Sequence, residues 1–237
     1  MPRPLRLAPD GWSIEILDQT CLPFSEEWRP LIGVAGAYAL CLALRDDDSD
    51  QAIAMASDAI VAARPTAVNL AWAVRMVGQA AASAAPGTRA TVACQAAASL
   101  VEAEVAACRA IGEHGLGVLR ECHGRAPDRP VQVMTHCNAG WLATLEHGTA
   151  LAPVYLACEE GIPVHVWVSE TRPRSQGWLT AWELSRSGVP HTVFADSAAG
   201  HLLQRGEVDA VVVGTDRTTR HGDVCNKIGT VLKALAA

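Results

Sequence analysis

The second half of the sequence alternates short strand-like runs with helix-like stretches, and this alternation limits the folds available to the chain. After residue 127, apolar runs rich in valine are separated by helical patterns of about ten residues. We predict strands over 131–135, 164–168, 191–195 and 210–213, and helices over 149–160, 179–187, 198–204 and 226–237. Such alternation is typical of βαβ units. Residues 127–237 are therefore expected to form an α/β domain around a parallel sheet.

The first half has a different, helical pattern. Helices are expected over about 31–44, 51–63, 67–84 and 88–120, the last as one or two helices, and residues 11–17 alternate like a strand. Pro127 and Pro130 mark the change of character. We predict a small, mostly helical domain over 1–126, followed by the α/β domain over 127–237.

Composition argues against several classes of function. The net charge is −6 with no visible basic patch, so no nucleic-acid partner is expected. The longest apolar run, 31–44, is shorter than the ~18–20 residues of a membrane span, so no membrane partner is expected. The eight cysteines form no C-x-x-C pair, which predicts free thiols in the cytoplasm and no structural zinc site. Phosphate-loop, dinucleotide and serine-hydrolase motifs are absent, so NAD, ATP and serine-hydrolase chemistry are poor interpretations.

Polar clusters follow each of the four predicted strands. They are 135–138 (Thr-His-Cys-Asn), 169–172 (Ser-Glu-Thr-Arg), 196–197 (Asp-Ser) and 214–217 (Gly-Thr-Asp-Arg). Ligands bind outside the carboxyl ends of the strands in open parallel sheets. Single members of these clusters could be helix caps, and Asp196 and Ser197 are expected to cap the helix that follows them. The four clusters together nevertheless predict a functional site at this edge.

Within these clusters we predict Cys137 and Asp216 as the reactive pair. A cysteine is more often a small buried hydrophobe, but Cys137 lies between polar neighbours directly after a strand, where a thiol can lose its proton. Asp216 follows an apolar strand, and a carboxyl held against apolar surface has a raised pKa and can serve as an acid. Two groups tuned in this way suit proton transfer between adjacent carbon atoms.

Further polar residues are candidates for holding an anionic substrate. Gln176 precedes a predicted helix, and Asn226 and Lys227 open another. A lysine at a helix start is electrostatically unfavourable unless an anion lies nearby. Arg64 precedes a helix start in the first half, where a phosphate would be stabilised. His136 is a weaker candidate, because a lone histidine beside a strand is more often structural.

Several motifs in order resemble the methylthioribose-1-phosphate isomerase family, which belongs to the initiation-factor 2B superfamily. The motifs are Arg-Pro-Thr-Ala-Val-Asn-Leu at 64–70, Thr-His-Cys-Asn-Ala-Gly at 135–140, His-Gly-Thr-Ala-Leu at 147–151, Glu-Thr-Arg-Pro-Arg-Ser-Gln-Gly at 170–177, Leu-Thr-Ala-Trp-Glu-Leu at 179–184, Gly-Thr-Asp-Arg at 214–217 and Gly-Asp-Val-Cys-Asn-Lys-Ile-Gly-Thr at 222–230. The resemblance covers nearly the whole chain. It implies a helical N-terminal domain, a Rossmann-like C-terminal domain and, where the C-terminal part that family members carry is supplied, a homodimer.

The resemblance also implies a reaction without cofactor or metal. Members convert 5-methylthioribose 1-phosphate, an aldose, to the ketose 5-methylthioribulose 1-phosphate in methionine salvage. Cys137 then stabilises the transition state or handles the proton, and Asp216 donates a proton. The substrate-contacting positions match Arg64, Gln176, Asn226 and Lys227.

This sequence departs from the family pattern in three places, one of which is the segment around 177–179, where one residue is missing. An N-terminal segment is shortened, so that Arg29 stands in for the arginine of the family's Arg-Gly-Ala-Pro motif as a substrate-binding candidate. The chain also stops in the helix after Asp216, which predicts a truncated Rossmann-like domain. Three alternatives to the main prediction remain: a ribose-1,5-bisphosphate isomerase or related sugar-phosphate isomerase, a non-catalytic relative that senses sugar phosphates or nucleotides, and an inactive truncated copy.

Overall fold

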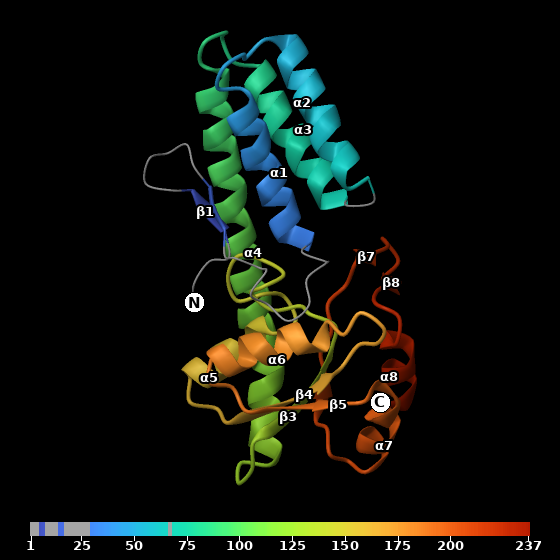
Figure 1. The fold of residues 1–237 in the computed structure, drawn as a ribbon. Coiled ribbons are helices and arrows are strands. Elements are labelled where there is room, and N and C mark those ends of the chain that lie inside the picture. Colours follow the sequence, from blue (N-terminus) through green and yellow to red (C-terminus); the bar gives the residue numbers. More distant parts are fainter. Residues whose placement is uncertain (1–4, 8–13, 17–28, 66–67) are drawn as a thin grey trace.

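A computed structural model describes residues 5–7, 14–16, 29–65 and 68–237 (Figure 1). It contains a helical bundle and an α/β part, joined by the longest helix, α4. The bundle helices are α1 (Arg29–Ala43), α2 (Asp50–Ala63), α3 (Val68–Ala82) and α4 (Arg89–Arg125), preceded by the antiparallel pair β1 (Leu5–Leu7) and β2 (Ile14–Ile16). The α/β part comprises β3 (Val131–His136), α5 (Ala152–Glu159), β4 (Val164–Ser169), α6 (Gly177–Arg186), β5 (His191–Phe194), the 3-10 turn η2 (Asp196–Ala198), α7 (Ala199–Gln204), β6 (Ala210–Val211), β7 (Arg217–Thr218), β8 (Val224–Cys225) and α8 (Thr230–Ala236).

The bundle forms because each helix buries an apolar face against its neighbours. Leu40 of α1, Val77 of α3 and Ala97 of α4 are completely buried where these three helices pack together. Ser49 caps α2, since its hydroxyl accepts a hydrogen bond from the backbone N–H of Ala52 at 3.1 Å. The predicted helices of the first half are all present, and 88–120 belongs to a single helix that continues to residue 125.

One pair of cysteines contradicts the expectation of free thiols. The structure links Cys41 of α1 to Cys94 of α4 through a disulfide, with their Cα atoms 5.3 Å apart. The two helices pack closely enough to bring the side chains together, which sequence spacing alone could not indicate. Cys137 and the exposed Cys225 are among the described cysteines that form no disulfide.

Helix α4 is long enough to contact both parts of the protein. Its first half packs against α1 and α3, and its second half packs against α5 (Figure 1). By length and composition alone it is the one helix in the described part of the chain that could cross a membrane. One face of α4 is buried along both halves, through residues spaced mostly three or four apart between Arg89 and Cys122. The predicted domain boundary at 126/127 falls between the end of α4 and the start of β3.

The four predicted strands of the second half form one parallel sheet in the order β5-β4-β3-β6. Register pairs Val133 of β3 with Val166 of β4 on one side and with Ala210 of β6 on the other. Helices α5 and α6 lie together above the sheet in Figure 1, and both contact β4. The α/β architecture agrees with the fold class expected from the alternating pattern.

The strand order reverses at β3, and this reversal positions the site. The chain runs from β3 to β4 and β5 on one side of the sheet, then returns to place β6 on the other side of β3. Loops leaving β3 and β6 therefore diverge and leave a crevice, the position where open α/β sheets bind ligands. Cys137 directly follows β3, and Asp216 comes five residues after the end of β6 at Val211.

The last predicted helix begins later than expected. We expected a helix from 226, but α8 begins at Thr230. Residues 217–225 instead form the small antiparallel pair β7–β8, and Gly229 adopts a left-handed φ of 102° before the helix. Sequence periodicity missed this hairpin because each of its strands has only two residues.

Candidate active site

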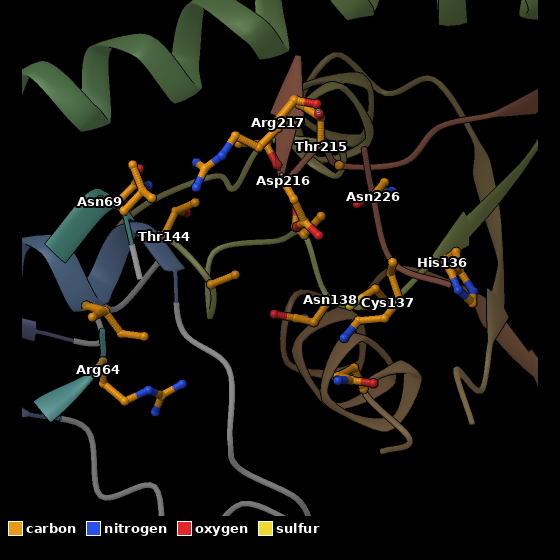
Figure 2. Close-up of a pocket in the computed structure, with 18 residues that line it drawn as sticks. Arg64, Asn69, His136, Cys137, Asn138, Thr144, Thr215, Asp216, Arg217 and Asn226 are labelled. Atoms are coloured by element: carbon orange, nitrogen blue, oxygen red, sulfur yellow. Dashed lines mark hydrogen bonds between the residues drawn. The ribbon is translucent and has the colours of Figure 1, made fainter. Parts of the chain in front are cut away.

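A cavity of about 330 Å³ opens at the carboxyl edge of the sheet (Figure 2). Its walls come from the loops after β3 and β6, the start of α6, the segment after β8, and the ends of α2 and α3 in the bundle. Six of the seven predicted site residues line it, namely Arg64, Cys137, Gln176, Asp216, Asn226 and Lys227. The seventh, Arg29, begins α1, but its side chain lies outside the described part of the chain.

Cys137 has an unusual backbone conformation. Its φ of 68° lies in the left-handed region, which non-glycine residues rarely adopt. The backbone N–H donates to Thr171 Oγ1 at 2.8 Å, and the backbone carbonyl accepts from Thr180 Oγ1 at 2.8 Å. The chain thus turns sharply as it leaves β3, and the half-buried side chain faces the cavity.

Asp216 and Asn226 are brought together by the β7–β8 hairpin. The backbone N–H of Asp216 donates to the carbonyl of Cys225 at 2.9 Å. Arg217 pairs with Cys225 in the hairpin, so Asp216 and Asn226 lie side by side at its open end. Figure 2 shows Asp216 pointing into the same space as Cys137 and Asn138. We expected an apolar enclosure around the Asp216 carboxyl, but in the described residues this side chain is only half-buried, because the hairpin that carries it is exposed.

Gln176 and Lys227 both line the cavity and contact each other. Gln176 is 6% exposed and precedes α6. In the amide orientation that satisfies both ends, its nitrogen donates to the carbonyl of Thr171 at 3.3 Å and its oxygen accepts from Lys227 Nζ at 3.2 Å. The loop after β4 therefore fixes the amide, and the amide in turn orients the lysine ammonium.

The helical bundle supplies one side of the cavity. Arg64 follows α2 and Asn69 belongs to the first turn of α3, and Figure 2 shows both reaching toward the cavity from the bundle side. The site is therefore shared between segments separated by more than half the chain. Its charged lining comprises three cations, Arg64, Arg217 and Lys227, and one carboxyl group, Asp216. This balance favours an anionic ligand.

His136 is a structural link beside the reactive positions. It is 1% exposed, and its Nε2 contacts the carbonyl oxygen of Ile228 at 2.7 Å. Burial lowers its pKa, although the Ile228 carbonyl opposes this shift. A neutral imidazole with its proton on Nε2 can donate this bond, so His136 ties the end of β3 to the segment that carries Asn226 and Lys227.

Asp196 does not cap the helix that follows it, contrary to our expectation. The N-terminus of α7 has no side-chain cap among the described contacts. The Asp196 carboxylate instead accepts hydrogen bonds from Ser169 Oγ and from the backbone N–H groups of Thr171, at 2.8 Å, and Arg172, at 2.7 Å. Burial raises its pKa, but these hydrogen bonds outweigh that effect and lower it. Asp196 therefore anchors the loop after β4.

Several cavity residues were not named as site residues from the sequence, among them Asn69, Thr144, Thr149 and Arg217. Arg217 belongs to the polar cluster 214–217, and Asn69 and Thr149 belong to motifs that resemble the family, so these positions carried a usable signal. Thr144 carries none, because nothing in its local sequence indicates which distant loop it faces. Among the described residues, no group of three or more histidine, cysteine or acidic side chains is placed to hold a metal.

The fold and the cavity define a Rossmann-like α/β protein with an anion-favouring small-molecule site at the reversal point of its parallel sheet. The comparisons with known proteins agree with this class. The chain belongs to the initiation factor 2 subunit family, which matches residues 27–237.

Curated relatives at about 50% identity are named methylthioribose-1-phosphate isomerase. The protein of Rhodospirillum centenum is 53% identical over 96% of this chain and 66% of its own length. That of Escherichia coli is 49% identical over 99% of this chain and 69% of its own length. This chain thus spans about two thirds of the length of the curated relatives it matches.

Two solved structures match the whole described fold. The 5-methylthioribose 1-phosphate isomerase of Pyrococcus horikoshii has a TM-score of 0.86 at 28% identity, covering 100% of this chain and 72% of its own. The translation initiation factor eIF-2B subunit delta of A. fulgidus has a TM-score of 0.84 at 32% identity, covering 100% and 74%. These matches confirm the family resemblance and the helical-plus-sheet architecture.

Proposed function

We propose that this chain is an aldose–ketose isomerase that converts 5-methylthioribose 1-phosphate to 5-methylthioribulose 1-phosphate, a step of methionine salvage. The observation that carries the proposal is the meeting of Cys137 and Asp216 in one cavity with Arg64, Gln176, Asn226 and Lys227. Relatives at about 50% identity carry the name of this activity.

The reaction moves hydrogen within one molecule. Opening of the furanose ring breaks the bond between C1 and the ring oxygen, and that oxygen gains a proton, for which Asp216 is the proposed donor. Hydrogen then moves from C2 to C1, and the C2 hydroxyl loses its proton as the ketone forms. Cys137 either carries the C2 proton to C1 as a base or stabilises the transition state of a hydride shift. Protons gained and lost balance, so the product is an isomer of the substrate.

The lining of the cavity suits a singly phosphorylated sugar with an apolar end. Lys227 and Arg64 supply charge for the phosphate, and Lys227 is held by Gln176. Ile32, Val68 and Ala143 add apolar surface, which fits a methylthio group better than a second phosphate. This observation favours methylthioribose 1-phosphate over ribose 1,5-bisphosphate.

A substrate comparison tests the proposal. Purified chain is incubated with 5-methylthioribose 1-phosphate and, separately, with ribose 1,5-bisphosphate, and ketose formation is followed. We expect kcat/KM for the first sugar to exceed that for the second by about tenfold or more. Preference for the bisphosphate would assign the alternative isomerase activity.

The similarity to an initiation-factor subunit supports a second candidate, a non-catalytic relative that binds a sugar phosphate or nucleotide. A chain that melts cooperatively, binds either ligand and turns over neither sugar would favour this candidate.

Our further predictions of a homodimer and of a cytoplasmic location are tested by size-exclusion chromatography with light scattering and by cell fractionation.

A further inference from the structure

The strained backbone of Cys137 needs support from its surroundings. A left-handed φ brings the Cβ of an L-residue close to the following carbonyl oxygen, so the conformation persists only where neighbouring contacts hold it. Both backbone hydrogen-bonding groups of Cys137 are held by threonine hydroxyls. Thr171 accepts from its N–H, and Thr180 of α6 donates to its carbonyl.

Helix α6 makes a second contact with the same loop, one turn after Thr180. Glu183 is completely buried, and its Oε2 accepts from the backbone N–H of Leu142 at 3.0 Å. Its Oε1 accepts from the hydroxyl of Tyr155 at 3.2 Å. Gly140 lies directly against this carboxyl group, with no room for a Cβ. Glu183 therefore fixes the far end of the loop that starts at Cys137.

The two contacts are joined through Asn138, the neighbour of Cys137. Its Nδ2 donates to Thr180 Oγ1 at 3.1 Å, so one hydroxyl binds both the Cys137 carbonyl and the Asn138 side chain. Cys137 and Asn138 line the cavity, whereas Thr180 and Glu183 lie behind it in the core. Any effect of these two residues on a ligand must pass through the loop.

We propose that Thr180 and Glu183 are positioning residues, which hold residues 137–142 so that the Cys137 thiol points into the cavity that Asp216 also lines. The orientation of the Cα–Cβ bond follows from φ, so a loop released from α6 would relax toward an ordinary φ and turn the thiol away. The catalytic consequence rests on the proposed isomerase function. The orientation of the thiol does not, and it is measurable without substrate.

The charge state of Glu183 agrees with this role. Burial raises its pKa to about 8, against the opposing effect of hydrogen bonds from Leu142, Tyr155 and Asn138. At neutral pH the group is mostly a neutral acid, which needs no charged partner in the core. Glutamine has similar size and keeps an acceptor oxygen, so it should replace glutamate here, whereas methionine keeps the volume and loses the acceptor.

The test compares paired substitutions that keep or remove each hydrogen bond. Thr180→Val and Glu183→Met remove the contact, and Thr180→Ser and Glu183→Gln retain it. Thr192→Val is the control, because this exposed threonine of β5 does not line the cavity. The readout is the rate of alkylation of Cys137 by iodoacetamide between pH 6 and pH 9, resolved by mass spectrometry, with the exposed Cys225 in the same sample as reference.

We expect Thr180→Val and Glu183→Met to change the Cys137 alkylation rate relative to Cys225 by about fivefold or more. In the isomerase reaction we expect kcat to fall by about tenfold or more with little change in KM, because a small misplacement of a reacting group lowers the rate steeply. Thr180→Ser, Glu183→Gln and Thr192→Val should stay close to the parent in both measurements.

Parent-like alkylation of Cys137 in folded Thr180→Val and Glu183→Met would overturn the proposal. If either variant fails to melt cooperatively, Thr180→Ala and Glu183→Asp replace it, since the shorter aspartate cannot reach the Leu142 N–H. Loss of rescue by serine and glutamine would equally contradict a hydrogen-bonding role. Changed alkylation in a chain whose parent shows no isomerase activity would support the positioning role and refute the proposed function.

Discussion

The buried carboxyl group of Glu183 makes a specific prediction about stability and pH. Its pKa is raised from 4.5 to about 8, chiefly by burial. Between these values the folded state keeps a proton that the unfolded state releases. The free energy of unfolding contributed by this group is thus complete below pH 4.5 and falls as pH rises through about 8. The separation of the two pKa values corresponds to about 5 kcal/mol.

The substitution Glu183→Gln isolates this effect, since glutamine does not titrate. Other shifted groups are common to both proteins and cancel in the difference between them. We expect the free energy of unfolding of the parent, minus that of Glu183→Gln, to fall by about 4 kcal/mol between pH 5 and pH 9, since the unfolded group is already partly ionised at pH 5. Most of the decrease should lie below pH 8.

Urea unfolding followed by tryptophan fluorescence measures this difference. The buried Trp141, whose ring centroid lies 5.9 Å from that of Trp182, reports on the region around the loop and α6. Titrations at one-unit intervals from pH 5 to pH 9 give the two profiles. Burial also raises the pKa of Tyr155, so this neighbour stays neutral throughout. Parallel profiles for the two proteins would refute the reasoning, because they would show that Glu183 has an ordinary pKa in the folded state.

Three further predictions concern other residues. Gly148→Ala should destabilise the protein by about 3 kcal/mol or more, because φ is 81° and a Cβ would collide with a neighbouring backbone; Gly87→Ala, with φ 84° and open space around it, should cost only about 1 kcal/mol in thermal or urea unfolding. Lys227→Met should raise KM for the sugar phosphate by about tenfold, whereas Arg220→Met, outside the cavity, should leave steady-state kinetics unchanged. For Asp209→Asn, the free energy of unfolding should fall less steeply with acidification than that of the parent. Hydrogen bonding to an arginine lowers the pKa of Asp209, so the ionised carboxylate stabilises the folded parent, and this stabilisation is lost as pH falls below 3.8.

The arrangement of the site was largely predictable because it depends on strand ends. Cys137 and Asp216 follow apolar runs, and parallel strands deliver their carboxyl ends to one edge of a sheet. The pattern alone gave four strands but no order. That β6 lies beside β3, which makes the two residues neighbours, emerges only from the long-range pairing of Ala210 with Val133.

What sequence reasoning missed depends on contacts between distant segments. Asp196 has the local pattern of a helix cap, yet its carboxylate is used by the loop after β4, because β4 and β5 are adjacent. Glu183 resembles any polar residue on a helix until the loop from β3 folds over it. The disulfide between Cys41 and Cys94 likewise depends on how two helices pack. Local propensity carries no information on such partners.

The central claim is that Cys137 and Asp216 together perform an isomerisation in one cavity. The most direct test is a ¹H NMR time course of 5-methylthioribose 1-phosphate with the parent, with Cys137→Ala and with Asp216→Asn, each first shown to melt cooperatively. We predict ketose formation by the parent and a loss of about 10²-fold or more in kcat/KM for each variant. A parent rate retained by either folded variant would contradict the claim.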